Sequence, residues 1–324
     1  MKFSIIVPVY DSQDTLRDCL DSIFSSEIKD FEVIVVNAKS TDKSAEIAKR
    51  YPCRLITLEE NKGAAFSRNI GKDNANGELL VFIDTDVAIK KNTLGLIAES
   101  FREDKGLAAV TGILSKESPH KDFFTQYKNL YMHYIFKRCP RYVDFLYGSL
   151  IAIRRDYFLR FDESFKITDD TELGQRYKKL NKKILLNPEL EVVHFKKYDF
   201  KGIIKNDFFV PFWWAKSFML HNGYKDILRK KRFSHTRMNQ IISIVVSYLL
   251  MISFLFWNKS WARVFSFILL LIFFLLNYDF FTFLRRERGL LFSIKSIIFT
   301  YLDMLIMGLG VLAGFIYFNV FVIS

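Results

Sequence analysis

The chain has 324 residues, enough for one large domain with an appendage or for two domains. Half of the residues are hydrophobic and 34 are Phe, which excludes an intrinsically disordered or collagen-like protein. The 47 Lys and Arg residues outnumber the 35 Asp and Glu residues, for a formal net charge of +12. Residues 241–324 hold only nine charged residues among 84, so we expect a soluble domain followed by a membrane part.

Short apolar runs alternate with helix-like segments through the first 100 residues. The apolar run at the amino terminus ends at Pro8, which is too short for a signal peptide, so we expect a strand there. Strands that alternate with helices form a largely parallel sheet covered on both faces, which predicts an α/β fold. The expected strands are residues 3–10, 32–36, 54–58 and 79–83, and the expected helices are residues 16–24, 44–50, 64–75 and 93–101.

Ligands bind to such sheets beyond the carboxyl ends of the strands, and acidic residues stand at one of these ends. Asp84-Thr85-Asp86 directly follows the apolar strand at residues 79–83. Two carboxylates one residue apart can both turn toward the crevice, and hard oxygen ligands suit Mg²⁺ or Mn²⁺ held together with phosphate. A single D-x-D sequence is also common in turns, so this motif alone does not establish a metal site.

A second acidic pair, Asp169-Asp170, follows Thr168 and opens a predicted helix that runs to Lys179. Thr168 or Asp169 could cap this helix, and acidic side chains interact favourably with its dipole. A structural and a catalytic role are compatible here, because a capped helix start holds a carboxylate rigidly over a cleft.

Several sequence blocks, taken in order, resemble the family 2 inverting glycosyltransferases with the nucleotide-diphospho-sugar (GT-A) fold. The blocks are SIIVPVYD, EVIVVNAKSTD, NKGAAFSRNIG, LLVFIDTD, GSLIAIRR with TDDTELGQR, and VVHF. The blocks in this order are far more specific than any one of them. The resemblance covers about residues 1–200 and implies a GT-A glycosyltransferase domain over residues 1–199.

The resemblance also implies roles for individual residues. The residues that it implies for binding the nucleotide-sugar are Pro8, Tyr10, Asp11, Asn37, Arg68 and Asp84. Those that it implies for binding the metal ion (Mn²⁺ or Mg²⁺) are Asp86, Asp84 and His194. It implies that Asp170, beside Asp169, is the catalytic base. The chemistry agrees, because a divalent ion stabilises the departing diphosphate and a carboxylate removes the proton of the acceptor hydroxyl. Repulsion from Asp169 would raise the pKa of Asp170. The alternatives are a surface ion pair for Arg68 and a purely structural role for His194.

The second block departs from the family pattern at Asn37-Ala38, where two acidic residues are usual. The second of them usually accepts the imide N–H of the base, and the Ala38 side chain cannot accept that bond. Asn37 or backbone carbonyls could replace it, so the donor nucleotide stays open. Asp169 stands where Glu is commoner, a change that keeps the charge.

Three nearly uncharged runs predict transmembrane helices over residues 241–257, 262–284 and 297–323. The segments before the first run and after the second are strongly basic, whereas the loop between these two runs holds only two basic residues. By the positive-inside rule, this predicts a multi-pass protein of the cell (plasma) membrane, with a cytoplasmic catalytic domain and the C-terminus outside. Asp303, in the third run, is either functional or interfacial.

Residues 200–238 are the expected connector to a membrane domain that comprises residues 239–324. Residues 200–220 are rich in aromatic residues with three interspersed lysines, and they either lie in the membrane interface or pack on the catalytic domain. Basic residues concentrate beside the predicted spans without a nucleic-acid-binding motif, so the expected partner is phospholipid and not nucleic acid. Cys19, Cys53 and Cys139 are far apart and suggest neither a disulfide scaffold nor a zinc site.

These features predict a membrane-bound enzyme of cell-surface glycan synthesis. It would transfer a sugar from a nucleotide-diphospho-sugar, with inversion, to a hydroxyl of a lipid-linked saccharide or glycolipid. The alternative is a polyprenyl-phosphate monosaccharide synthase, but a phosphate acceptor is already a nucleophile and needs no base such as Asp170. A processive synthase is disfavoured because Gln175-Arg176-Tyr177 does not match a Q-x-x-R-W block. A non-catalytic membrane scaffold is an alternative of another class, supported only by Asn37-Ala38.

Overall fold

The computed structural model describes residues 1–321, so residues 322 and 323 of the third predicted transmembrane helix lie outside the described part. The chain divides into two compact units. The amino-terminal unit comprises residues 1–121 and 135–197, and the carboxy-terminal unit comprises residues 122–134 and the chain from residue 198 onward.

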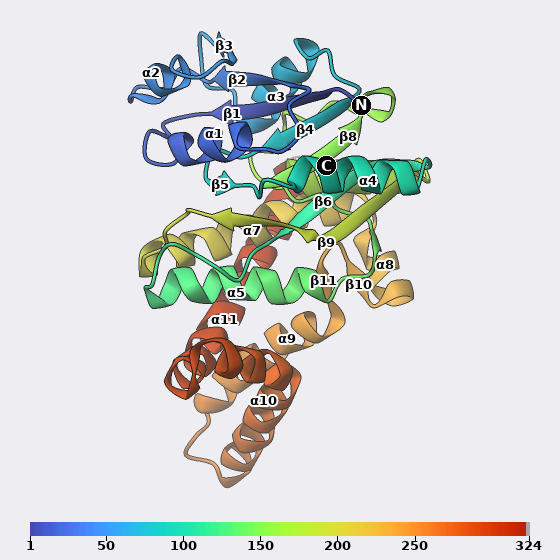
Figure 1. Ribbon diagram of the computed structural model, residues 1–324. Helices are drawn as coiled ribbons and strands as arrows, with labels where there is room; N and C mark the ends of the chain where they lie inside the picture. Colours follow the sequence, from blue (N-terminus) through green and yellow to red (C-terminus); the bar gives the residue numbers. More distant parts are fainter. Residues whose placement is uncertain (322–324) are drawn as a thin grey trace. The chain divides into compact units, whose positions relative to one another are not determined.

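The amino-terminal unit is built on one mixed sheet with the strand order β3-β2-β1-β4-β8-β6-β9-β5 (Figure 1). Strand β7 adds to this sheet by pairing with β9. The first four strands in this order are parallel, and β8 runs antiparallel to both of its neighbours. The strands are β1 (Phe3–Val9), β2 (Phe31–Asn37), β3 (Arg54–Thr57), β4 (Leu79–Ile83), β5 (Val87–Ala88), β6 (Leu107–Leu114), β7 (Tyr142–Val143), β8 (Leu150–Arg154) and β9 (Lys183–His194).

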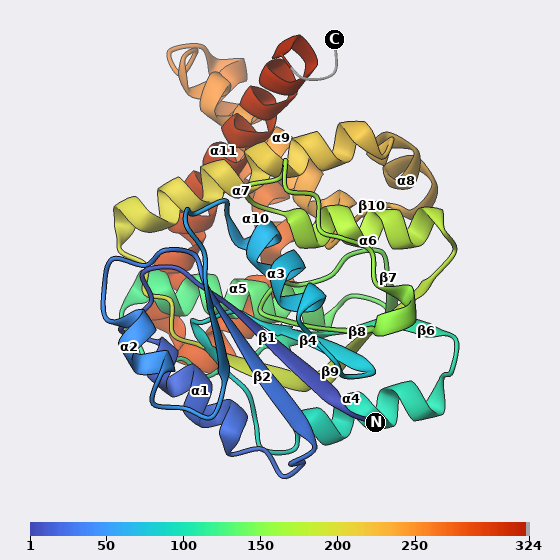
Figure 2. The ribbon, with the colours of Figure 1, turned by 90° about the horizontal axis from the view of Figure 1, so that it is seen from above.

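Helices cover both faces of this sheet, α1 and α4 on one face and α3 and α6 on the other (Figure 2). The buried side chains of α1 recur at helical spacing, which is why this segment forms an amphipathic helix. The predicted α/β fold is confirmed, although the sheet is mixed where a largely parallel one was expected, because β5, β7 and β8 run antiparallel to their neighbours. Each strand and helix predicted for the first 100 residues lies within a few residues of the observed one. The helices are α1 (Leu16–Phe24), α2 (Ser44–Ala48), α3 (Ala64–Asp73), α4 (Thr93–Glu103), a 3₁₀ turn at Arg155–Tyr157 and α6 (Asp169–Lys179), while α5 (Phe123–Lys137) runs from one unit into the other.

Helix α3 lies unusually close to the sheet because Gly71 faces it. A Cβ atom built on Gly71 would lie 2.3 Å from Cγ2 of Ile6 on β1, so no larger residue fits there without displacing the helix. This contact places Arg68, one turn earlier in α3, beside the carboxyl end of β4. The close approach of α3 is therefore what brings a buried arginine to the D-x-D segment.

The carboxy-terminal unit is mostly helical. Residues 260–288 and 290–320 form helices that are long and apolar enough to cross a membrane, and a shorter apolar helix covers residues 238–254. The unit contains residues 123–134 of α5, α7 (Phe200–Leu220), α8 (Gly223–Lys230), a short β10 (Arg232–Phe233) and β11 (Thr236–Arg237) hairpin, α9 (Met238–Phe254), α10 (Ser260–Arg288) and α11 (Leu290–Phe321).

Helix α7 packs along α11, a contact that neither sequence-based alternative for residues 200–220 included. Cβ atoms built on Gly310 and Gly314 would lie 2.2 and 2.4 Å from the carbonyl oxygens of Phe208 and Phe212. Two glycines four residues apart thus let the two helix backbones meet, as small residues do in membrane-protein helix pairs.

Asp303 of α11 is buried inside the carboxy-terminal unit. It accepts a hydrogen bond from Tyr127 of α5 over 3.3 Å, and the same hydroxyl lies 3.0 Å from Oγ1 of Thr300. Nearby, Lys128 of α5 forms an ion pair with the buried Asp207 of α7. The polar groups therefore connect α5 with α7 and α11.

Candidate active site

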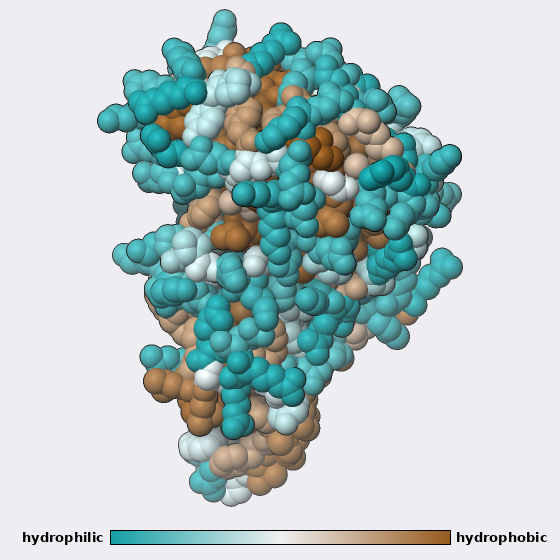
Figure 3. Space-filling model, in the orientation of Figure 1, coloured by the Kyte–Doolittle hydropathy of each residue, from teal (hydrophilic) through white to brown (hydrophobic). Residues whose placement is uncertain are grey.

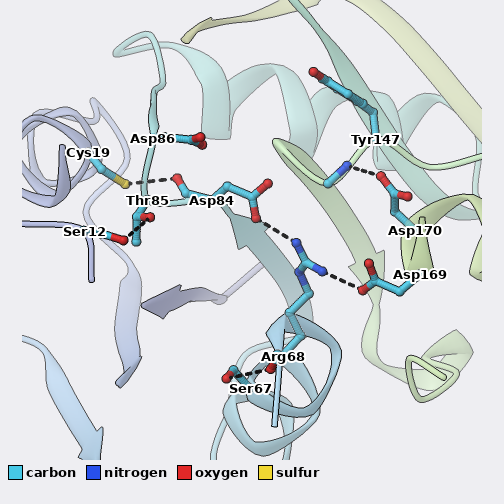
Figure 4. A network of polar contacts seen from close by, with 12 residues as sticks. Ser12, Cys19, Ser67, Arg68, Asp84, Thr85, Asp86, Tyr147, Asp169 and Asp170 are labelled. Carbon is cyan, nitrogen blue, oxygen red and sulfur yellow. Dashed lines mark hydrogen bonds and ion pairs between the residues drawn. The ribbon is translucent and has the colours of Figure 1, made fainter. Parts of the chain in front are cut away.

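A buried arginine connects the two acidic motifs of the amino-terminal unit. Arg68 donates from Nη2 to Oδ1 of Asp84 over 2.7 Å and from Nη1 to Oδ2 of Asp169 over 2.6 Å (Figure 4). Its guanidinium also lies over the ring of Phe161, with 5.4 Å to the ring centroid. Arg68 is only 4% exposed, so the surface ion pair considered from the sequence is instead a buried bridge between two carboxylates.

The D-x-D segment leaves β4 at the predicted place and is tied to α1 and the first loop. The thiol of Cys19 donates to the carbonyl oxygen of Asp84, and Oγ1 of Thr85 donates to Oγ of Ser12 over 3.0 Å. Lost hydration raises the pKa of Asp84, and the charge of Arg68 opposes this effect without cancelling it. The Oδ1 atom of Asp84 forms the ion pair with Arg68.

Asp86 faces a histidine from the far strand of the sheet. Its Oδ2 lies 3.3 Å from Nε2 of His194, because β5 pairs antiparallel with β9 and brings Val87 opposite His194. Burial alone would raise the pKa of Asp86, but the hydrogen bond and charge of His194 lower it. Asp86 is therefore an ionised carboxylate beside His194, and with the imidazole in its neutral form the two side chains are a donor pair that divalent metal ions accept.

Asp170 sits in the first turn of α6 with its carboxylate fixed by two backbone N–H groups. Gly148 donates to its Oδ2 over 2.7 Å and Thr171 donates to its Oδ1 over 2.6 Å. Lost hydration and then repulsion from Asp169 raise the pKa of Asp170 to about 7. A carboxylate with a pKa near neutral pH is suited to accept a proton in a reaction at that pH.

The two acidic motifs meet at Gly148. A Cβ atom built on this glycine would lie 3.3 Å from Oδ2 of Asp84, from Oδ2 of Asp170 and from Nη2 of Arg68. The two carboxylate oxygens are therefore no more than twice that distance apart. The acids predicted for donor binding and for base catalysis face one small region of the amino-terminal unit.

The first two predicted nucleotide-contacting blocks form one loop system at the ends of β1 and β2. Oδ1 of Asp11 accepts a hydrogen bond from the Thr41 N–H over 2.7 Å, and Asp11 adopts a positive φ of 42°. Asn37 is only 2% exposed, and its Oδ1 accepts from the Ser40 N–H over 3.0 Å. Its side chain therefore shapes the loop, whereas Tyr10 is 50% exposed. Pro8 lies within β1 opposite Val36.

The predicted side-chain cap of α6 is wrong. Thr168 precedes the helix in the left-handed region, with φ of 69°, and forms no side-chain hydrogen bond to the helix start. This backbone conformation turns the chain so that Asp169 and Asp170 open the helix. Asp169 thus bonds outward to Arg68, while Asp170 accepts from the Gly148 N–H and from the Thr171 N–H in the first turn of α6.

Two residues of the site were not assigned a role from the sequence. Gly148 positions Asp170 through its N–H, and Tyr147 precedes it, with a pKa raised first by burial and further by the nearby carboxylates of Asp86 and Asp170. Both lie at the start of the GSLIAIRR block or directly before it. Gly148, the first residue of this block, was the feature of the sequence that could have indicated a role in the site.

The mixed sheet, the D-x-D segment at the end of β4 and the acidic pair of α6 together define the GT-A class of fold. Residues 4–161, just under half of the chain, match the family described as Glycosyl transferase family 2. A solved structure of the mannosyltransferase PcManGT from Pyrobaculum calidifontis matches with a TM-score of 0.58 and 15% identity, covering 100% of this chain and 88% of that chain.

Curated relatives are longer than the matched part of this chain. Glycosyltransferase GlyA of Streptococcus pneumoniae is 30% identical over 215 residues, which are 60% of this chain and 31% of that protein. Teichoic acid poly(glycerol phosphate) polymerase of Staphylococcus epidermidis is 27% identical over 221 residues, which are 64% of this chain and 29% of that protein. The match thus spans less than a third of the length of either relative.

Proposed function

We propose that this chain is a glycosyltransferase that moves a sugar from a nucleotide-diphospho-sugar, with inversion, to an acceptor hydroxyl. The observation that carries the proposal is the convergence of Asp84 and Asp170 on Gly148, where an oxygen of each carboxylate lies 3.3 Å from the position that a Cβ atom would take. Inversion requires the departing diphosphate and the attacking hydroxyl with its base to lie on opposite sides of the same sugar carbon. Two separately held carboxylates at one small region are suited to that task.

Asp170 is the base of this proposal. Its carboxylate is held by the N–H groups of Gly148 and Thr171, and its pKa of about 7 lets it take a proton from an acceptor hydroxyl near neutral pH. Arg68 holds Asp169 beside it, so the charge that raises the pKa of Asp170 is fixed in place. The side chain of Asp170 remains partly exposed, as a base that meets an acceptor must be.

Asp86 and His194 fit a divalent ion. Their facing atoms lie 3.3 Å apart, close to the ~3 Å between neighbouring ligands of an octahedral ion with bonds of about 2.1 Å. Within residues 1–321 no three His, Cys, Asp or Glu side chains form a complete metal-binding group, so the donor diphosphate and water would supply the other ligands. Mn²⁺ or Mg²⁺ held there would supply positive charge for the departing diphosphate. The PcManGT structure is a complex with GDP-Man and Mn²⁺, which supports this choice of ion.

The setting that we propose is cell-surface glycan synthesis at the plasma membrane. The similarity to a teichoic acid polymerase supports a role in cell-surface glycan synthesis, and two long apolar helices support a membrane location. A catalytic domain over residues 1–199, a connector over residues 200–238 and a multi-pass membrane domain over residues 239–324 complete the proposal, with the catalytic domain in the cytoplasm. The acceptor would be a lipid-linked saccharide or glycolipid, and a polyprenyl phosphate is the alternative.

Transfer by the purified protein tests this proposal. Membranes with and without the protein are screened with UDP- and GDP-sugars, and the lipid product is identified by mass. The purified protein is then compared with Asp86→Ala and with Asp30→Ala, an exposed aspartate directly before β2, in the presence of Mn²⁺. We expect Asp86→Ala to lose transfer and Asp30→Ala to keep it. Equal rates for the protein and Asp86→Ala would refute the proposed site.

A further inference from the structure

Helix α8 presents an exposed face that is both apolar and basic. Tyr224 and Leu228, four residues apart, are 51% and 70% exposed, and Lys225 and Arg229 are exposed beside them. The single acidic residue of the helix, Asp226, is buried on the opposite face. The four residues Tyr224, Lys225, Leu228 and Arg229, here named the α8 face, therefore carry positive charge around an apolar centre.

The helix that carries the α8 face is hydrogen-bonded to the start of an apolar helix pair, α9 and α10. The Met238 N–H at the start of α9 donates to the carbonyl oxygen of Lys231 over 2.9 Å, which fixes the end of α8 beside the start of α9. Lys231 itself is exposed and adopts a positive φ of 57°, so the chain turns sharply where α8 ends. The orientation of α8 is thus set by the start of α9.

Helices α9 and α10 run antiparallel, which places a second basic group at the same end. Asn277 donates to Ser243 over 2.8 Å near this end, and Ser253 bonds to Ser266 over 2.7 Å near the other end. The start of α9 therefore lies level with the end of α10, which carries the exposed Arg285 and Arg286.

Between its two ends, the α9–α10 pair exposes apolar side chains. Val245 of α9 and Val264, Phe267 and Leu275 of α10 are each at least half exposed. Hydrophobic residues also gather in Figure 3 over the part of the molecule that Figure 1 labels α10. Such a surface belongs in hydrocarbon, and basic side chains at one end of it then stand at the depth of lipid headgroups.

We propose that the α8 face, together with Lys231, Arg285 and Arg286, binds the anionic headgroups of the membrane leaflet that the α9–α10 pair enters. Tyr224 and Leu228 would enter the boundary between headgroups and acyl chains, and the basic groups would contact lipid phosphates. This inference rests on the membrane setting of the proposed function but not on glycosyl transfer. The positive charge selects an anionic lipid over a neutral one, and the exposed apolar centre selects a lipid over a free phosphate.

Lipid titration of the full chain in detergent tests the inference. Binding of dioctanoyl phosphatidylglycerol is measured by thermophoresis, with dioctanoyl phosphatidylcholine, glycerol phosphate and a single-stranded oligonucleotide as comparison ligands. The double variant Lys225→Gln/Arg229→Gln is compared with Lys49→Gln/Arg50→Gln, which removes the same charge from exposed positions at the end of α2. Leu228→Ser tests the apolar centre without a change of charge.

We expect the unchanged protein to bind phosphatidylglycerol more tightly than it binds any of the three comparison ligands. Each basic residue removed from the α8 face should weaken phosphatidylglycerol binding about fivefold. Leu228→Ser should weaken phosphatidylglycerol binding as well, and Lys49→Gln/Arg50→Gln should leave it unchanged. Equal binding by both double variants, or binding of glycerol phosphate or the oligonucleotide as tight as that of phosphatidylglycerol, would overturn the inference. Because no sugar donor is present, these results are independent of transfer activity, and carbonate extraction of membranes tests the membrane setting separately.

Discussion

Replacement of Asp170 by Asn tests the proposed base most directly. The amide has the size of the carboxylate but cannot accept a proton at neutral pH, so donor binding should persist while transfer falls. Removal of a general base costs typically ~10²–10⁴-fold in rate. The Asn side chain keeps an oxygen for only one of the N–H groups of Gly148 and Thr171, which will cost some stability.

The pKa of Asp170 also predicts how the rate of transfer and the stability of the protein depend on pH. With a pKa of about 7, the base is half ionised near neutral pH, so the rate of transfer should fall about tenfold per pH unit well below pH 7. The stability of the folded protein should change with pH in the opposite direction to the rate. Because the folded pKa lies above the ordinary value of 3.8, the unfolded chain releases this proton first, and stability falls as pH rises from about 4 to about 7. The difference of roughly three pH units between the two pKa values sets an upper limit of ~4 kcal/mol on this loss.

Single-turnover transfer and thermal unfolding, each measured from pH 5 to pH 9, check both parts. The control is Asp156→Asn, which makes the same chemical change at an exposed position in the 3₁₀ turn after β8. We expect Asp170→Asn to lose the acid limb of the rate profile together with most of the rate, and to show a flatter dependence of the unfolding temperature on pH. A rate that Asp170→Asn leaves within about threefold of the unchanged protein would refute the assignment of the base.

Three further predictions follow from the same contacts. Asp169→Asn removes a negative charge beside Asp170 and should move the acid limb of the rate profile down by on the order of one pH unit, as read from the same pH series; an unchanged limb would contradict the repulsion. Arg68→Ala leaves two carboxylates without their buried cation and should lower the free energy of unfolding by about 3–5 kcal/mol in denaturant titration; a loss below about 1 kcal/mol would contradict the bridge. Gly310→Leu forces a side chain into the α7 backbone and should destabilise the protein by about 1–3 kcal/mol in detergent, whereas Gly95→Ala, where a Cβ atom meets nothing within 4 Å, should change it by no more than ~1 kcal/mol; equal unfolding temperatures would argue against the helix contact.

The elements of the amino-terminal unit were predictable because their signals are local. Every residue of β4 is buried, so its sequence is a continuous apolar run, and the acidic residues that follow mark its end. The D-x-D segment and the acidic pair could be placed on the sheet edge and on a helix start for the same reason. Their convergence was implied by the family resemblance and not by any local signal, since it depends on Gly148, whose role is a contact between segments far apart in the chain.

The helix contacts of the carboxy-terminal unit show a different limit of sequence reasoning. Gly310 and Gly314 have the spacing typical of close helix pairs, but the spacing does not say which helix approaches. Asp303 stood out as a polar residue in an apolar run, and its partner Tyr127 lies 176 positions earlier in a helix that the sequence analysis did not single out. Hydropathy identifies the helices of such a unit, whereas the partners follow only from packing.

Arg68 explains how two acidic motifs from separate segments can act as one site. A buried ion pair contributes little net stability, because the cost of removing the charges from water offsets their attraction. Its geometry is the stronger effect here, since the planar guanidinium presents two donors in a fixed fork, one toward Asp84 and one toward Asp169. A lysine at this position has one charged nitrogen and could not hold both carboxylates in the same arrangement. The bridge neutralises Asp84 and fixes Asp169 beside the base, which leaves Asp86 as the D-x-D carboxylate available to a metal ion. Arg68 is therefore a positioning residue, and Arg68→Lys should lower transfer far more than it lowers stability.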